Sequence, residues 1–225
     1  MANSAIFWDF DGTLSHPNKR FETALYLAIT ENGYEADPSV CEAFLETAYP
    51  WKQPFSLIVT EENWWRLLLQ RIRSFCKSIG LPAQAASPIC ERFRELLIDV
   101  GNYRLYEDTI STLAHFQNAG YRNYLLTNNY PEITNNLEAL GIKSYFSNFV
   151  ISSLLGWEKP SPMLYAIAKD IAGNPECCYM VGDNPIADIE GGNRAGMKTI
   201  YIHNGFLSTA WNCADTLTDT IPLIK

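Results

Sequence analysis

The chain begins with a short apolar run that stops abruptly at polar residues. The run from Ser4 to Trp8 is almost entirely apolar, and Asp9 and Asp11 follow within three positions. A short continuous apolar run bounded in this way is typical of a buried strand that delivers polar groups at its carboxyl end. We therefore predict a strand over residues 4–8.

A long block with helical periodicity follows, from about Asn18 to Ile98. Its first stripe has the i, i+3, i+4, i+7, i+8 spacing of one helix face, in Phe21, Ala24, Leu25, Ala28 and Ile29. Similar stripes recur within residues 63–79 and 89–100. The block contributes no predicted strand, so we interpret residues 18–98 as a helical cap inserted after the first strand.

Beyond Tyr106 the pattern alternates between strands and helices. Apolar runs separated by helical stretches predict four more strands, over residues 121–126, 149–151, 178–181 and 199–202. Such alternation is typical of a parallel sheet with right-handed crossovers. The predicted fold class is α/β: a doubly wound, Rossmann-like parallel sheet core (residues 1–17 and 99–225) with an inserted α-helical cap subdomain (residues 18–98).

Composition and charge indicate which partners and which cellular location to expect. The 225 residues include 17 Lys plus Arg against 25 Asp plus Glu, a net charge of −8, so we expect neither a nucleic-acid nor an anionic membrane partner, which would need a basic face. No apolar run approaches the roughly 20 residues of a membrane span, and we expect no secretory leader. The six cysteines lack paired spacing, as expected of reduced thiols in a cytoplasmic protein.

Three predicted strands end in residues that can bind or transfer charged groups. Asp9 and Asp11 follow the first strand, Thr127 ends the second, and Asp183 with Asp188 follows the strand near residue 180. In open parallel sheets, ligands bind beyond the carboxyl ends of the strands. We therefore expect these side chains to converge on one pocket.

The expected pocket carries excess negative charge. Lys159, which precedes a helix predicted to begin near Pro162, is the cation expected beside the four carboxylates. Mutual repulsion makes such a cluster costly without a divalent ion. Because its ligand atoms are oxygens, Mg²⁺ is the expected cofactor.

Four groups of residues stand in a recognisable order along the chain: Asp9-Phe10-Asp11-Gly12-Thr13-Leu14, Thr127-Asn128, Lys159-Pro160, and Gly182-Asp183 with Asp188. In this order they resemble the four motifs of the haloacid dehalogenase-like (HAD) hydrolase superfamily, over Ile6 to Gly196. Many members of that superfamily insert a helical cap directly after the first motif. Each motif alone has an ordinary structural interpretation, such as a helix start with Asn184 as N-cap and Pro185 in the first turn. The four together favour the family.

The resemblance implies the catalytic roles. Asp9 would attack phosphorus and form an aspartyl-phosphate. Asp11 would protonate the leaving oxygen and then help to deprotonate the hydrolytic water. Mg²⁺ would lie on the side chains of Asp9 and Asp183 and on the backbone carbonyl of Asp11.

The resemblance also implies how the phosphoryl group is bound. Thr127, the amide of Asn128 and Lys159 would contact the phosphoryl oxygens. Asp188 would orient Lys159 or a metal-bound water. Phosphoryl transfer depends on positioning and charge stabilisation, and this set of residues would supply both.

The chain departs from the family pattern at a few positions. Asp11 stands where the dehalogenases that named the family typically lack an acid, so dehalogenation is disfavoured. The stretch from Leu14 to Pro17 lacks the acidic residue that usually comes two positions after the Leu. Asn129 stands where small residues are common. In the cap, the segment from Trp51 to Pro54 is predicted to be a loop that contacts the leaving group.

We therefore predict a Mg²⁺-dependent phosphomonoester hydrolase that acts through an aspartyl-phosphate on a small phosphorylated metabolite. A sugar-phosphate mutase of the same superfamily is one alternative, and it would show bisphosphate-primed isomerisation in place of phosphate release. A non-hydrolytic phosphoacceptor or regulatory module is the other, and a long-lived aspartyl-phosphate would favour it. The expected oligomeric state is a monomer or a weak homo-oligomer.

Overall fold

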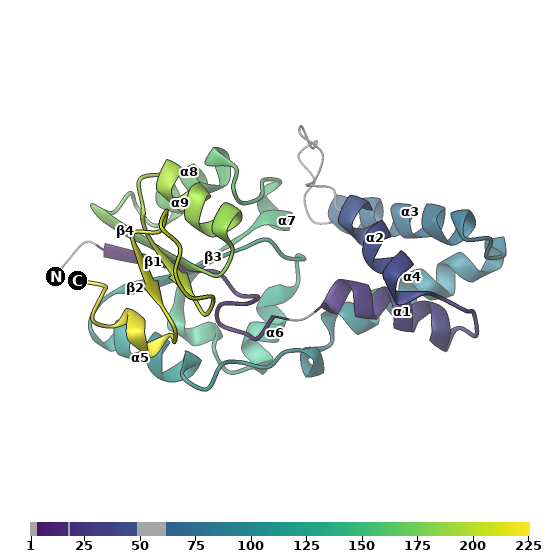
Figure 1. The fold of residues 1–225 in the computed structure, drawn as a ribbon, viewed down its shortest axis with the longest axis horizontal. Coiled ribbons are helices and arrows are strands. Elements are labelled where there is room, and N and C mark those ends of the chain that lie inside the picture. Colours follow the sequence, from purple (N-terminus) through teal and green to yellow (C-terminus); the bar gives the residue numbers. More distant parts are fainter. Residues whose placement is uncertain (1–3, 18, 49–61) are drawn as a thin grey trace. The chain divides into compact units, whose positions relative to one another are not determined.

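The computed structural model describes residues 4–17, 19–48 and 62–225, and the chain folds as two compact units. One unit comprises Met1–Asn18 with Tyr103–Lys225, and the other comprises Lys19–Asn102. Figure 1 shows a sheet with flanking helices in the first unit and helices in the second. The segment from Trp51 to Pro54, predicted to contact substrate, lies outside the described residues.

The first unit is built on a six-stranded sheet in which every neighbouring pair is parallel, in the order β3-β2-β1-β4-β5-β6. The strands are β1 (Ser4–Trp8), β2 (Arg122–Thr127), β3 (Phe146–Ile151), β4 (Cys177–Gly182), β5 (Lys198–Ile202) and β6 (Asn212–Ala214). This confirms the predicted α/β class with a Rossmann-like parallel sheet. The strand order reverses between β1 and β4, which is where open parallel sheets bind ligands.

Two strands differ from the prediction. β3 begins at Phe146, three residues before the predicted start, because its middle residues Ser147 and Asn148 are exposed and polar and interrupt the apolar run. β6 was not predicted at all. It spans only three residues at the sheet edge, two of them only partly buried, so it carries little apolar signal.

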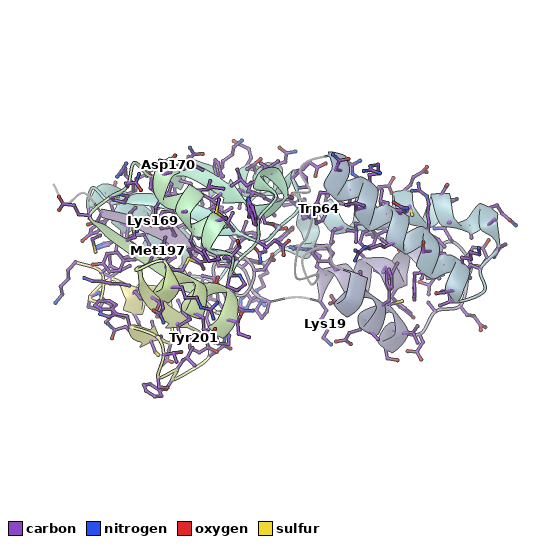
Figure 2. All side chains as sticks on the ribbon, turned by 90° about the horizontal axis from the view of Figure 1, so that it is seen from above. Lys19, Trp64, Lys169, Asp170, Met197 and Tyr201 are labelled. Carbon is purple, nitrogen blue, oxygen red and sulfur yellow. The ribbon has the colours of Figure 1, made fainter. Side chains whose placement is uncertain are left out.

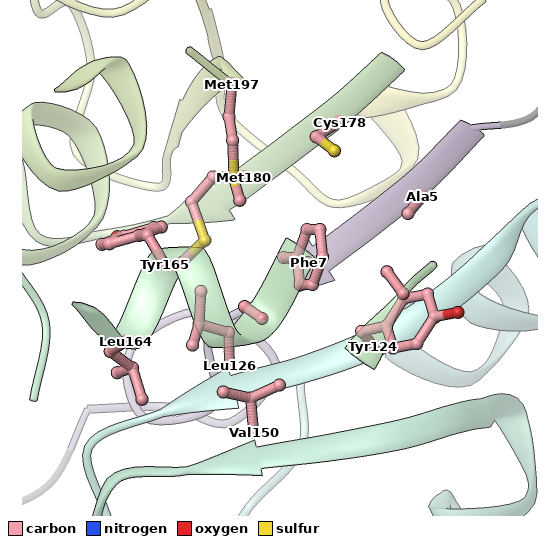
Figure 3. Close-up of a cluster of buried hydrophobic side chains, with 12 residues drawn as sticks. Ala5, Phe7, Tyr124, Leu126, Val150, Leu164, Tyr165, Cys178, Met180 and Met197 are labelled. Carbon is pink, nitrogen blue, oxygen red and sulfur yellow. The ribbon is translucent and has the colours of Figure 1, made fainter. Parts of the chain in front are cut away.

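Helices cover both faces of the sheet, as a doubly wound fold requires (Figure 1). They are α5 (Thr109–Asn118), α6 (Ile133–Ala139), α7 (Ser152–Leu155), α8 (Pro162–Ile171) and α9 (Gly191–Arg194), with short 3₁₀ turns at Lys143–Tyr145 and Thr218–Thr220. Figure 3 shows the packing between the strands and α8, where Leu164 and Tyr165 meet Phe7 and Leu126. This buried apolar layer fixes the strands, and therefore the side chains at their carboxyl ends.

The second unit is helical throughout its described residues. Its helices are α1 (Arg20–Glu31), α2 (Pro38–Ala48), α3 (Glu62–Ser78) and α4 (Ala86–Ile98), with 3₁₀ turns at Ala83–Ala85 and Val100–Asn102. The predicted face of α1 is buried at Ala24, Leu25, Ala28 and Ile29, and α1 packs against α2 and α4. Trp64 (labelled in Figure 2) and Trp65 lie edge to face with ring centroids 5.0 Å apart. Both are buried, so they pack this unit's core.

In the part of the chain that the structure describes, no helix is long and apolar enough to cross a bilayer.

The stretch after the first motif is tied to the segment that returns from the helical unit. The carbonyl of Leu14 accepts hydrogen bonds from the backbone N–H of Tyr106 (3.2 Å) and the hydroxyl of Thr109 (2.7 Å). The N–H of His16 donates to the carbonyl of Arg104 (2.8 Å), and the His16 ring lies 3.9 Å from that of Tyr106. These contacts anchor the residues at which this chain departs from the family pattern.

Candidate active site

The first site residues lie on the loop that follows β1. Asp9 extends the strand, since its N–H donates to the carbonyl of Val181 in β4 (3.0 Å), and its side chain is largely buried. Gly12 then turns the chain with a φ of +83°, and a Cβ at this position would overlap the carboxylate of Asp183. Both the backbone conformation and the close approach therefore require glycine.

Lys159 joins two of the buried carboxylates. Its Nζ lies 2.7 Å from an oxygen of Asp9 and 2.7 Å from an oxygen of Asp188. The three side chains are 2%, 11% and 0% exposed respectively. Lys159 is therefore a buried cation and not the solvated surface lysine that its residue type alone suggests.

Asn128 fixes the backbone of Lys159 to the end of β2. Its Oδ1 accepts from the Lys159 N–H (2.8 Å), and its Nδ2 donates to the Lys159 carbonyl (3.1 Å). The side chain of Asn128 is thus engaged with protein backbone. A contact with a phosphoryl group would fall to its backbone amide, as the resemblance implies.

Asp183 and Asp188 are placed by the turn that follows β4. A π-helical turn spans Pro185–Glu190, and the Asn184 side chain caps it by accepting from the N–H groups of Ile186 (3.0 Å) and Ala187 (2.9 Å). The predicted helix start is therefore real, and it coexists with the carboxylate site. Single π-turns of this kind are frequent at functional sites.

The π-helical turn also places the Asp188 side chain beside the end of β4. Asp188 accepts from the Asn184 N–H through Oδ2 (3.0 Å) and from Lys159 Nζ through Oδ1 (2.7 Å). A Cβ on Gly182 would overlap this carboxylate, so the strand can end here only in glycine. Both oxygens of Asp188 are thus engaged by donors of this chain.

Burial and crowding raise the pKa values of the carboxyl groups. Oxygen atoms of Asp9, Asp183 and Asp188 lie within 4.8 Å of one another. Burial raises the pKa of Asp9 well above its ordinary value, Lys159 opposes the shift, and Asp188 and Asp183 add to it. Burial and the nearby Asp188 raise the pKa of Asp183 to about 6. Burial and the excess of negative charge therefore both disfavour the ionised forms of Asp9 and Asp183.

The pKa of Lys159 is shifted in the direction that keeps its charge. Burial alone would lower this pKa, but the attraction of Asp188 and Asp9 outweighs burial and raises it. Lys159 is therefore a permanent cation in the cluster, and it contacts Asp9 and Asp188 directly. Three carboxylates with all-oxygen ligand atoms fit a hard divalent cation.

The remaining predicted residues form a second group beside the cluster. Thr127 is buried at the end of β2. Asp11 accepts a hydrogen bond through Oδ2 from the Asn129 side chain (2.8 Å), whose Nδ2 also lies 3.5 Å from the Thr127 hydroxyl. Asn129 was not among the predicted site residues. Its departure from the small residue common in the family was the available signal.

Comparisons with known proteins identify the relatives of this chain. A family model described as a haloacid dehalogenase-like hydrolase matches residues 4–196. The chain is 31% identical over 180 residues to a phosphoserine phosphatase of Thermus thermophilus, covering 70% of this chain and 69% of the relative. It is 31% identical over 206 residues to a glyceraldehyde 3-phosphate phosphatase of Methanopyrus kandleri, covering 89% and 84%.

A solved structure shares the fold along the whole chain. The putative HAD-hydrolase YfnB from Bacillus subtilis, solved bound to magnesium, aligns with 100% of this chain and 99% of its own, with a TM-score of 0.74 at 16% identity. The match of the family model over residues 4–196 confirms the resemblance found in the sequence motifs. This chain belongs to the haloacid dehalogenase-like hydrolases.

Proposed function

We propose that the chain is a Mg²⁺-dependent phosphomonoester hydrolase that acts through an aspartyl-phosphate on Asp9. The observation that carries this proposal is the buried contact of Asp9 with Lys159, within a cluster of carboxylates at the switch point of the sheet. The named phosphatases among the relatives support the same reaction class.

The chemistry follows from two carboxyl groups with different tasks. A carboxylate oxygen of Asp9 attacks phosphorus, and the bond from phosphorus to the ester oxygen breaks. The electron pair goes to the leaving oxygen, which takes a proton from Asp11. Water then attacks the phosphoryl group and gives a proton to Asp11, while the bond from phosphorus to Asp9 breaks. The sum is monoester plus water giving alcohol plus phosphate.

Lys159 and the end of β2 bind the phosphoryl group in this proposal. The Lys159 ammonium, the Thr127 hydroxyl and the backbone amide of Asn128 would contact the phosphoryl oxygens and stabilise charge in the transition state. Asp188 acts as a positioning residue, because its Oδ1 accepts a hydrogen bond from Nζ of Lys159 at 2.7 Å.

Asp9 and Asp183 would hold the magnesium ion through their side chains, and Asp11 would do so through its backbone carbonyl. Asp188 is a poorer ligand, because both its oxygens already accept hydrogen bonds from Lys159 and Asn184. When bound, Mg²⁺ would supply positive charge that offsets the carboxylates and the phosphoryl oxygens.

The helical unit would act as a cap over a small phosphorylated metabolite. By name, the two relatives act on phosphoserine and on glyceraldehyde 3-phosphate, so both compounds belong in a substrate panel. The expected cytoplasmic location and the expected monomer or weak homo-oligomer stay predictions.

The test is phosphate release from p-nitrophenyl phosphate and a panel of phosphorylated metabolites, with Mg²⁺ and with EDTA. We expect release that requires the metal. Isomerisation with a bisphosphate primer and without release would favour a mutase. A long-lived phosphoenzyme without turnover would favour a phosphoacceptor. Release unaffected by EDTA would contradict the proposed metal dependence.

A further inference from the structure

Asn129 makes a specific contact with the carboxyl group that the mechanism uses for proton transfer. Its side-chain Nδ2 donates to Asp11 Oδ2 at 2.8 Å, although the two residues are 118 positions apart in the sequence. Asn129 is 3% exposed and Asp11 is half-buried, so the donor side of this hydrogen bond is buried and the carboxyl group is still partly open to solvent. The contact joins the loop after β1 to the loop after β2.

The orientation of the amide follows from its other partners. Oδ1 of Asn129 accepts from the backbone N–H of Tyr130 (3.1 Å), so the nitrogen of the amide must face Asp11. The backbone N–H of Asn129 donates to the Ser152 hydroxyl (3.2 Å). Asn129 is thus held from both its backbone and its side chain.

The residue that follows Asn129, Tyr130, is anchored in the core. Tyr130 is fully buried, and its hydroxyl is 2.7 Å from that of Tyr103 and 3.1 Å from Oδ1 of Asn136. A side chain anchored on buried neighbours loses little additional entropy when it orients a catalytic group. The amide of Asn129 can therefore hold a carboxyl group in one position.

We propose that Asn129 is a positioning residue that holds Asp11 for protonation of the leaving oxygen. Because Nδ2 donates to Oδ2 of Asp11, this oxygen is an acceptor, and the contact limits the orientations in which the acid form of Asp11 presents its proton. When the bond from phosphorus to the ester oxygen breaks, that proton moves to the leaving oxygen and Asp11 becomes a carboxylate. This inference rests on the proposed phosphatase function.

Loss of a residue that positions the general acid should lower kcat/KM unequally for different esters. Loss of a residue that only stabilises the site should lower kcat/KM equally for all of them. Protonation matters greatly for a basic leaving group and little for a weakly basic one. Phenyl phosphate and p-nitrophenyl phosphate have similar shapes and differ in this basicity. The value of kcat/KM covers the steps through departure of the leaving group, so it isolates the step in which Asp11 donates.

The experiment compares kcat/KM for these two esters, with Mg²⁺ present, in wild type and Asn129→Ser. Serine is one of the small residues that fit such a position, and its hydroxyl stops one bond short of Nδ2. We expect a loss of about 10–100-fold for phenyl phosphate and of less than about threefold for p-nitrophenyl phosphate. Asp11→Asn should show the same selectivity with a larger loss.

Two further variants keep the test sharp. Asn129→Asp preserves the size of the side chain and the acceptor for Tyr130, and it should show the same selectivity if the serine variant is unstable. Asn148→Ser is the matched control, because Oδ1 of Asn148 also accepts from the next backbone N–H (2.8 Å) but lies exposed on β3. The control should retain wild-type kcat/KM for both esters.

Equal losses on both esters in the Asn129 variants would overturn the inference, because they would indicate general support of the loop. Unchanged rates in folded Asn129 variants would overturn it as well. If Asp11→Asn treats both esters alike while the wild type still releases phosphate, the inference fails and the proposed hydrolase stands. If the wild type releases phosphate from neither ester, both fail.

Discussion

A buried ion-pair cluster in the sheet unit and an exposed ion pair in the helical unit lie in opposite environments. In the sheet unit, Lys159 and its partners Asp9 and Asp188 are almost completely buried, at 2%, 11% and 0% exposure. In the helical unit, Arg92 and Glu31 form a pair of similar length, 2.6 Å, with side chains 40% and 42% exposed. The N–O distances of these pairs are similar, so the pairs differ in the burial of their side chains.

Burial changes what an ion pair contributes. An exposed pair gains about 0–1 kcal/mol, because water and salt screen it. A buried cluster gains strong attractions but also strong repulsions. For Asp9 and Asp183, burial and the neighbouring carboxylates outweigh the attraction of Lys159 and raise the pKa of each group. The sheet unit thus concentrates unfavourable charge at the place where a cation and a phosphoryl group would bind.

The largest effect is expected from Lys159→Met, which removes the buried cation. Phosphate release should fall about 100–1000-fold, because a charge that stabilises the transition state is lost. The free energy of unfolding at pH 7 should fall by about 3 kcal/mol, because Asp9 and Asp188 lose their partner. Urea unfolding and kcat/KM measure both effects.

Lys143→Met is the matched control for that variant. Lys143 pairs with Glu138 at 3.0 Å, and their side chains are 39% and 70% exposed. We expect a change in stability of less than about 1 kcal/mol and no change in activity. Similar losses of stability in the two lysine variants would remove the distinction between the buried and exposed pairs.

Asp183→Asn should stabilise the protein in EDTA at pH 7.5. In the folded state Asp183 has a pKa of about 6, above the value of about 3.9 expected in the unfolded chain. Folding therefore takes up protons between pH 4 and 6, so stability declines as pH rises through this window. The neutral variant should gain about 1–2 kcal/mol at pH 7.5 and almost nothing at pH 4.

The same variant should lose its response to magnesium. Mg²⁺ should raise the unfolding temperature of the wild type and leave that of Asp183→Asn unchanged. Asp170→Asn, on the exposed face of α8 (Figure 2), is the control and should behave like the wild type in both respects. If Asp183→Asn is less stable than wild type in EDTA at pH 7.5, this would contradict the conclusion that burial and the neighbouring Asp188 disfavour the charged form of Asp183.

The smallest effect is expected from Arg92→Ala in the helical unit. Arg92 donates to Glu31 (2.6 Å) and to Glu95 (3.0 Å), and these side chains are well exposed. Thermal unfolding should show a loss within about 1 kcal/mol that shrinks in high salt. A loss above about 2 kcal/mol, independent of salt, would show that exposure does not weaken this pair.

Strand ends could be predicted from the sequence because the signal is local. Apolar runs that stop at Asp9, Thr127 and Asp183 locate the carboxyl edge of a parallel sheet, and the sheet brings these ends together. β6 could not be predicted in this way, because three edge residues, two of them only half-buried, carry no apolar run.

The side-chain hydrogen bonds of Asn128 and Asn129 could not be predicted, because they depend on loop conformation. The hydrogen bonds between the Asn128 side chain and the Lys159 backbone join residues 31 positions apart. The hydrogen bond from Asn129 to Asp11 joins residues 118 positions apart. Neither contact follows from periodicity or from strand alternation. The sequence motifs therefore indicated which residues lie near one another, whereas the loop conformations determine which atoms form hydrogen bonds.

The most direct test of the central claim is turnover by Asp9→Asn. Phosphate release from p-nitrophenyl phosphate in the presence of Mg²⁺ would be measured for wild type and variant, with thermal unfolding to establish that both are folded. The account predicts metal-dependent release by the wild type and a loss of at least about 1000-fold in a folded variant, because the nucleophile is removed. Retained turnover in Asp9→Asn would contradict the assignment of Asp9 as the group that attacks phosphorus.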